Sequence, residues 1–258
     1  MGGKKNRNSA KARAKKERLA ALAREDAEIK AKISSANFVA VENGDGGASK
    51  THVSPRNVLD LVPALTAYKR NGLECSIEFF APGVALEYPS GDLVEDMIDL
   101  NEKNMKEIYN LASGEGWNRA AKKRDMVDES SRFFIAFDAE RSIVGYVNVR
   151  FIIEGNCCVA YVYDVQVRQE SSRKGLGKWL MMIVELIARK LDLGWVMLTV
   201  FNANKEGLKF FPEKLKYTVD ETSPQFEAYG DTDDTPYVIL SKNLKPQTQG
   251  ECRPKLVQ

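Results

Sequence analysis

The sequence predicts an α+β domain whose sheet is mixed but mostly antiparallel. Three consecutive stretches rich in β-branched and aromatic residues lie at 132–137, 143–153 and 159–167, as expected for neighbouring strands of a meander. The stretch 174–190 follows them and is apolar on most sides, which indicates a largely buried helix. A further strand is expected at 195–201. This order differs from the regular alternation of strands and helices in a doubly wound sheet.

The remaining segments frame this centre. An N-terminal helix is expected over 9–33, which is rich in Ala, Lys, Glu and Arg and carries a sparse apolar stripe. The other expected elements are a flexible linker at 42–50, a short helix from Pro55 to Tyr68, a strand at 75–80, a helix at 92–111, a short helix at 204–214 and closing strands at Tyr217 and at 237–240. We therefore divide the chain into a basic helix and linker at 1–52, a main domain at 53–244 and a disordered polar tail at 245–258.

A single histidine narrows the possible chemistry. His52 follows the glycine-rich linker and is expected on a loop. Without a second histidine, the sequence argues strongly against a Ser-His-Asp triad and an H-E-x-x-H zinc site. The four cysteines form no C-x-x-C pair, so we expect no metal and a reduced, intracellular setting. General acid–base catalysis would therefore have to use carboxylates, tyrosines, lysines, water or the substrate itself.

The charge of the chain is unevenly distributed. Residues 1–18 contain eight Lys or Arg against one Glu, which leaves 30 basic and 35 acidic residues in the rest of the chain. The basic segment is either a nuclear import signal, a nucleic-acid contact or a solvated helical tail, and the mildly acidic body suits a basic substrate. No run approaches the roughly 18 apolar residues of a membrane span, so no membrane association is expected.

A glycine-containing turn, Ser172-Arg-Lys-Gly-Leu-Gly-Lys178, joins the third predicted strand to the buried helix. Glycines let the backbone approach a ligand closely, and a helix N-terminus offers free N–H groups and a partial positive charge. The turn is therefore either an anion site or a plain helix entry. It is not a Walker A loop, because Trp179 stands where Ser or Thr is required, and it has too few glycines for a dinucleotide fingerprint.

This turn resembles the acetyl-CoA pyrophosphate motif of the GNAT acetyltransferases, with Ser172 in place of the usual Arg or Gln. The strand at 195–201 and the helix at 204–211 are similar to the second half of that family. Other stretches resemble the histone-specific NatD group of N-terminal acetyltransferases, in order from about residue 4 to residue 241. These stretches are Asn71-Gly-Leu-Glu-Cys-Ser-Ile-Glu78, Tyr163-Asp-Val-Gln-Val167, Arg173-Lys-Gly-Leu-Gly-Lys178, Val196-Met-Leu-Thr-Val-Phe201 and Ser223-Pro224.

The resemblance implies a GNAT fold with an added N-terminal helix and acetyl-CoA as the co-substrate, without a metal. It implies transfer of acetyl to the N-terminal serine of histone tails that begin Ser-Gly-Arg-Gly, of the H-four and H-two-A types. Histone tails would be the partners, with weak nucleic-acid contact through the basic arm, in the nucleus and cytoplasm. The cofactor-binding residues that it implies are Val165, Val167, Arg173, Lys174, Gly175, Leu176, Gly177, Lys178 and Asn204.

The same resemblance assigns the chemistry to Tyr161, Tyr163 and Asp164. Asp164 stands where the family has a glutamate base; it is one methylene shorter, which favours a bridging water. Strict alternation along a strand would place Tyr163 and Asp164 on opposite faces, so the resemblance implies a β-bulge here. Phe210 and Phe211 lie where many GNAT enzymes carry a tyrosine that acts as a general acid. The leaving group is a thiolate whose thiol has a pKa of about 8.5, so it can depart without a general acid.

The substrate-binding residues that the resemblance implies are Tyr109, Glu154, Tyr161, Tyr163, Thr222 and Tyr237. Glu154 would pair with the arginine at the third position of the substrate. Two positions depart from the family, since Ile152 replaces an acidic residue and Glu115 aligns with a tryptophan. Two other readings stay open: a lysine or small-amine acetyltransferase that shares only the cofactor site, and an inactive module that binds histone tails.

Overall fold

The computed structural model describes residues 3–42, 51–84, 86, 92–112, 114–224 and 235–245, and of 3–15, 40–42 and 51–53 it describes the backbone alone. Most of the predicted linker and of the predicted C-terminal tail lies outside these residues. Among the helices described, none has the length and apolar character that crossing a membrane would require.

Within the described residues, the centre of the molecule is an eight-stranded sheet in the order β3-β4-β5-β6-β7-β8-β10-β9. Only the β7–β8 pair is parallel and the other neighbours are antiparallel, so the predicted mixed, mostly antiparallel sheet is confirmed. The strands are β3 (Ala67–Arg70), β4 (Leu73–Phe80), β5 (Arg132–Phe137), β6 (Ile143–Glu154), β7 (Cys157–Val167), β8 (Trp195–Phe201), β9 (Thr218–Val219) and β10 (Tyr237–Asn243).

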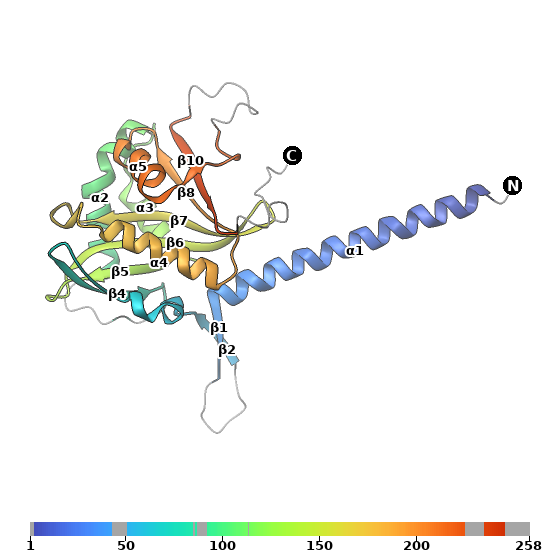
Figure 1. The fold of residues 1–258 in the computed structure, drawn as a ribbon, viewed down its shortest axis with the longest axis horizontal. Helices are drawn as coiled ribbons and strands as arrows, with labels where there is room; N and C mark the ends of the chain where they lie inside the picture. The colour runs from blue at the N-terminus through green and yellow to red at the C-terminus, as the bar shows by residue number, and fades with distance from the viewer. Residues whose placement is uncertain are drawn as a thin grey trace.

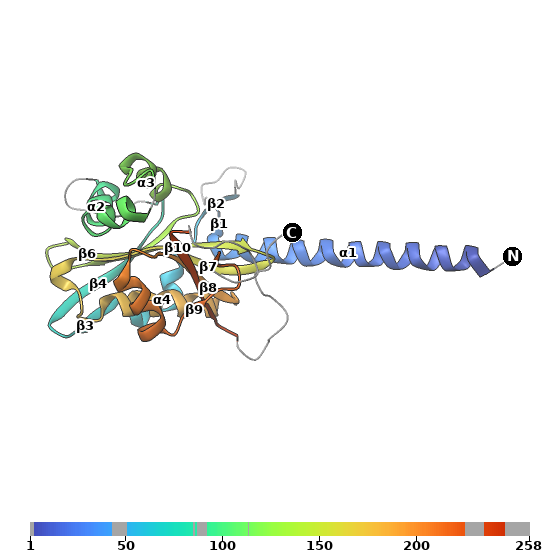
Figure 2. The same cartoon turned by 90° about the horizontal axis from the view of Figure 1, so that it is seen from above.

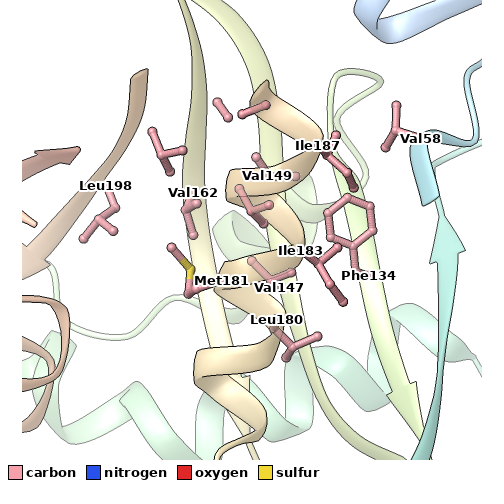
Figure 3. Close-up of a cluster of buried hydrophobic side chains, with 14 of the residues drawn as sticks. Val58, Phe134, Val147, Val149, Val162, Leu180, Met181, Ile183, Ile187 and Leu198 are labelled. Carbon is pink, nitrogen blue, oxygen red and sulfur yellow. The ribbon is translucent and has the colours of Figure 1, made fainter. Parts of the chain in front are cut away.

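Helices cover both faces of the sheet, α4 (Leu176–Lys190) on one side and α2 (Leu93–Ala112) with α3 (Arg119–Met126) on the other (Figures 1 and 2). Strands in the middle of such a sandwich are buried on both faces, which explains why 132–137 is apolar with only one charged residue. On the α4 face, Leu180, Ile183 and Ile187 of the helix pack over Val147 and Val149 of β6 (Figure 3).

Helix α1 (Gly3–Asn37) extends from the body into solvent for most of its length (Figures 1 and 2). Its 35 residues span about 50 Å at 1.5 Å per residue. Side chains 16–28 are exposed, and only the last turns dock, where Ile29 and Ile33 pack against the core and Asn37 Nδ2 donates to the Phe151 carbonyl at 2.9 Å. The helix is longer than the predicted 9–33 at both ends.

A two-stranded hairpin, β1 (Phe38–Glu42) and β2 (Thr51–Pro55), follows α1. The expectation of a loop at His52 is wrong, because this residue pairs with Val41 in the hairpin. The predicted helix from Pro55 to Tyr68 is wrong too: the segment forms two short 3-10 turns at Val58–Leu61 and Pro63–Leu65 and then enters β3. Pro63 lacks the N–H that a continuous α-helix would use there.

The later elements follow the predictions closely. Strand β8 spans the predicted residues, and α5 (Lys205–Lys209) continues into a π-helical turn at Phe210–Lys214. Helix α4 begins at Leu176, two residues later than predicted. Cys75 and Cys158 are free, whereas Cys157 is disulfide-bonded, which the expected reduced setting did not anticipate.

Candidate active site

The parallel strands β7 and β8 are paired over only part of their length and then separate. Their pairing runs from Val159 opposite Trp195 to Val162 opposite Leu198, although β7 continues to Val167 and β8 to Phe201. A cavity of about 500 Å³ lies where they separate, lined by residues from both strands and from α2, β6 and β10. The backbone of β7 beyond Val162 therefore has a strand partner on one side only, and its other edge is available to a ligand.

A β-bulge occurs in β7 at the same place. Asn148 of β6 pairs with Asp164 and the next residue, Val149, pairs with Val162, so Tyr163 is the extra residue. Val162 belongs to the core under α4, while Asp164 contacts α2 and α3. The bulge lets Tyr163 turn toward the α2–α3 face as well, where its ring lies 4.0 Å from the Arg150 guanidinium. The predicted bulge is confirmed.

Asp164 is buried and surrounded by donors. Lys122 Nζ lies 2.8 Å from its Oδ2, Asn101 Nδ2 donates to its Oδ1 at 2.6 Å, and Gln166 Nε2 reaches the same oxygen at 3.4 Å. A carboxylate offers about four acceptor positions. Three are therefore occupied by protein groups, which leaves about one for a substrate amine or a water.

Lys122 forms a buried ion pair with Asp164, since the two side chains are only 7% and 5% exposed. Burial alone would lower the pKa of Lys122, but the carboxylate of Asp164 and then Tyr109 outweigh burial and raise this pKa above its usual value. Tyr109 hydrogen-bonds to the same ammonium, and its own pKa is raised, chiefly by burial. Lys122 is therefore a fixed positive charge at neutral pH, immediately beside the proposed base.

Sequence reasoning missed Lys122 because it missed the helix that carries it. Helix α3 has no apolar repeat, and its side chains are mostly charged or small. Its one local signal is the N-cap Asn118, whose side chain accepts from the Ala121 N–H at 2.9 Å. Arg119 then ties α3 to Glu95, Asp99 and Glu102 of α2.

Tyr161 bridges the two diverging strands. Its hydroxyl lies 2.6 Å from Thr199 Oγ1 of β8, and its ring is 5.5 Å from that of Tyr163. Burial raises the pKa of Tyr161, so its hydroxyl stays protonated at neutral pH. Tyr163 is more accessible, at 39% exposed. The two rings thus present one inner hydroxyl and one outer aromatic surface to the cavity region.

The turn that enters α4 has the backbone of an anion site. Arg173 and Gly175 adopt left-handed conformations with φ of 59° and 95°, after which the helix begins at Leu176. The first hydrogen bond into the helix runs from the Trp179 N–H to the Gly175 carbonyl, so the N–H groups of the preceding residues lack an intrahelical acceptor. A Cβ on Gly177 would lie 3.8 Å from Val167, which brings the turn against the end of β7.

Most of the predicted substrate and catalytic residues come together. Those that line the cavity are Tyr109, Glu154, Tyr161, Tyr163, Asp164 and Thr222, together with Val165 and Asn204, which were predicted to bind the cofactor. Tyr237 is not among the lining residues and starts β10 opposite Phe201. Asn204 uses its side-chain oxygen to cap α5, accepting from Gly207 at 2.8 Å. The predicted phosphate residues lie outside the cavity, at the adjoining end of β7.

Residues 102–217 match the model of the Acetyltransferase (GNAT) family. Among solved structures, the chain is similar to a GNAT-family acetyltransferase from Staphylococcus aureus Mu50, with 12% identity over 66% of this chain and 100% of that one and a TM-score of 0.48. It is also similar to a PaiA N-acetyltransferase from Thermoplasma acidophilum solved with coenzyme A, with 20% identity, 65% and 99% coverage and a TM-score of 0.45.

A third similar structure is Ard1 from Thermoplasma volcanium, with 17% identity over 66% of this chain and 97% of that one and a TM-score of 0.44. These similarities are distant and do not bear on the substrate. The family match covers α2 from residue 102 onward, α3, β5 to β8, the turn into α4 and α5, which include the separating strands and the anion-type turn. Residues 102–217 therefore match the GNAT acetyltransferase family, and acetyl-CoA is the co-substrate typical of that family.

Proposed function

We propose that the protein is an N-terminal α-amino acetyltransferase that acts on histone tails beginning Ser-Gly-Arg-Gly. The observation that carries this proposal is the bulge in β7, which gathers Tyr161, Tyr163 and Asp164 on one side of the strand separation. Acetyl-CoA would place its pyrophosphate at the turn before α4 and its thioester beside the free edge of β7. The peptide would enter over the tyrosines from the α2–α3 side.

The reaction forms an N–C bond and breaks the C–S bond of the thioester. The lone pair of the neutral amine attacks the carbonyl carbon, and the tetrahedral intermediate then expels the CoA thiolate. The proton leaves the nitrogen for the open acceptor position of Asp164, directly or through a water. Holding the amine and the thioester in line supplies most of the rate, as in other positioned bimolecular reactions.

The Lys122–Asp164 pair supports an α-amine over a lysine as the acceptor. The pair carries no net charge, so it attracts an incoming ammonium less than a lone carboxylate would, and the acceptor has to arrive as the neutral amine. An α-amine with a pKa of about 7.8 is roughly one quarter neutral at pH 7.4, whereas a lysine with a pKa of about 10.4 is only about 0.1% neutral. This difference favours chain termini by more than two orders of magnitude.

Glu154 supports a basic residue near the substrate terminus. It lies at the end of β6 and lines the same cavity as the tyrosines. A carboxylate there can hold the arginine of Ser-Gly-Arg-Gly through charge-assisted hydrogen bonds. Ile152, two residues earlier, also lines the cavity and adds no charge. We therefore propose recognition of this arginine by one carboxylate.

If histone tails are its partners, the protein acts in the nucleus as well as in the cytoplasm. The free length of α1 supports this proposal, because residues 4–18 carry eight cations against one anion on a helix that extends away from the body (Figure 1). Such a segment suits weak contact with nucleic-acid phosphates. It lies far from the cavity and is proposed to aid localisation, not acetyl transfer.

Mapping the acetyl group on the product tests this proposal. A Ser-Gly-Arg-Gly peptide that also contains lysines is incubated with the protein and acetyl-CoA, and mass spectrometry locates the modification. We expect acetyl on the serine α-amine, and no product when the α-amine is blocked beforehand. Acetyl on lysine side chains would overturn the N-terminal assignment, and no turnover on any peptide would overturn the enzymatic one.

A further inference from the structure

The carbonyl of Lys174 accepts two hydrogen bonds from a hairpin more than 100 residues earlier in the chain. Tyr68 Oη donates to it at 2.5 Å and Asn71 Nδ2 donates at 2.8 Å. Both donors come from the β3–β4 hairpin, whose turn residues Asn71 and Gly72 have φ of 51° and 69°, as a tight two-residue turn requires. We call these two donors and the Lys174 carbonyl the hairpin brace.

Tyr68 is fixed in place by the first turn of α4. Its side chain is buried, and its ring meets the Trp179 ring edge to face at 5.4 Å. Trp179 in turn donates to the Leu65 carbonyl at 3.1 Å, and the Arg70 guanidinium lies over the Trp179 ring at 4.8 Å. The hydroxyl of Tyr68 therefore has a defined position and is not a mobile surface group.

The brace acts on the peptide unit that opens the anion-type turn. In a planar trans peptide the C=O of one residue and the N–H of the next point in opposite directions. When the Lys174 carbonyl is held toward the hairpin, the Gly175 N–H is aimed away from it. Without the two donors, the carbonyl could rotate to the side where a phosphate would lie and repel it. Gly175 has no Cβ, and a Cβ there would come 2.8 Å from the Tyr68 hydroxyl.

We propose that Tyr68 and Asn71 are positioning residues for the pyrophosphate of acetyl-CoA, acting through the Lys174 carbonyl to hold the N–H groups of the turn toward the phosphates. This inference rests on the proposed cofactor site at the turn but not on the identity of the acetyl acceptor. It assigns a cofactor role to the β3–β4 hairpin, which lies outside the matched family segment.

The test compares two acetyl donors, acetyl-CoA and S-acetylpantetheine, which has the thioester and pantetheine arm but no phosphates. The variants are Tyr68→Phe, Asn71→Ala and the double variant, with Lys69→Ala as a control on the same hairpin whose ion pair with Glu74 is exposed. We expect each single variant to weaken acetyl-CoA binding about fivefold, as the loss of one hydrogen bond implies, and the double variant to weaken it more. The KM for S-acetylpantetheine should not change, and thermal unfolding checks that each variant folds.

An unchanged calorimetric Kd for acetyl-CoA in the folded double variant would overturn the inference. So would an equal loss with both donors, because that result describes a hairpin that merely stabilises the domain. Calorimetry needs no acceptor peptide, so the inference can hold even if the α-amine is not the site of acetylation. Absence of acetyl-CoA binding by the unaltered protein would remove both the cofactor site and the brace.

Discussion

Both faces of the central sheet bury apolar side chains, but only one of them also buries a linked group of polar side chains among the described residues. Under α4 the packing is almost entirely apolar, with Leu180, Ile183 and Ile187 against the valines of β6. Under α2 and α3 the sheet also buries an apolar cluster, which includes Met97, Phe133 and Ile135. Beside this cluster it buries a linked polar group that comprises Asn101, Lys122, Arg150, Asp164 and Gln166. Burying polar groups costs stability unless they are paired, so this second face depends on ion pairs and hydrogen bonds that the first does not need.

The difference shows how the fold separates stability from chemistry. The bulge at Tyr163 changes which residues of β7 reach each face, so that Val162 and Val165 complete the apolar core while Asp164 joins the polar group. Mutations on the α4 face should therefore change mainly the free energy of unfolding. Mutations in the polar group under α2 and α3 should change turnover and specificity as well.

The largest expected effect on stability is that of Lys122→Met. Removing the ammonium leaves the Asp164 carboxylate buried without its ion-pair partner, which costs about 3–5 kcal/mol of unfolding free energy. The folded pKa of Lys122 is raised, so its contribution is fully present at neutral pH and is lost only as the pH rises past the usual lysine value of about 10.4. Urea unfolding at pH 7 and above pH 10 measures both effects.

The neighbouring Lys123→Met provides the matched control. Lys123 is on the same helix, but its side chain is 49% exposed and pairs with Glu95 at the surface. We expect this variant to change unfolding little. Equal destabilisation by the two substitutions would mean that the buried ion pair contributes no more to the free energy of unfolding than the surface pair does.

The next effect is that of Ile183→Ala under α4. Ile183 is fully buried in the apolar core, and truncating such a side chain costs about 3 kcal/mol because a cavity remains. The kcat/KM of the folded fraction should stay within about twofold, since an effect confined to the apolar face lowers stability without touching the site. A large loss of kcat/KM at full folding would break the proposed separation between the two faces.

A smaller effect is expected on substrate choice. Glu154→Ala should remove most of the preference for Ser-Gly-Arg-Gly over Ser-Gly-Ala-Gly, a difference of about 1–3 kcal/mol in transition-state binding. Ile152→Asp should increase the preference by restoring a second carboxylate. The ratio of kcat/KM values on the two peptides measures this, with Glu140→Ala, an exposed carboxylate elsewhere, as a control for net charge. If Glu154→Ala leaves the ratio unchanged, Glu154 does not recognise the arginine of the substrate.

The smallest effect on turnover is expected from deleting residues 4–18. These residues belong to the part of α1 that extends away from the body (Figure 1), so peptide acetylation should stay nearly intact. Nucleic-acid binding and nuclear accumulation should both weaken, and the binding that remains should depend less on salt. Loss of peptide acetylation in a folded deletion variant would contradict this division of roles.

Much of this architecture follows from local sequence pattern. The strands from β5 to β8 are long and rich in β-branched and aromatic residues, and α4 is apolar over most of its surface, so their bounds could be predicted closely. Helix α3 could not be predicted this way, because it has no apolar repeat: Met126 packs in the apolar core, while Lys122 and Arg119 attach the helix through ion pairs.

The candidate site was predictable only in part. Tyr161, Tyr163 and Asp164 are neighbours in sequence, and the resemblance supplied the bulge that brings them together. Contacts between distant segments leave no local pattern, which is why the Lys122–Asp164 pair and the bonds from Tyr68 and Asn71 to Lys174 emerge only from the folded chain.

The pH dependence of kcat/KM for Asp164→Asn tests the central claim most directly. If Asp164 takes the proton of the acceptor amine, the variant should still bind acetyl-CoA and should lose about 100-fold or more in kcat/KM near pH 6.5. The gap should narrow above about pH 9, where the α-amine is neutral without assistance. Profiles of the same height and shape for the two proteins would remove Asp164 from the mechanism and contradict the account of the polar face.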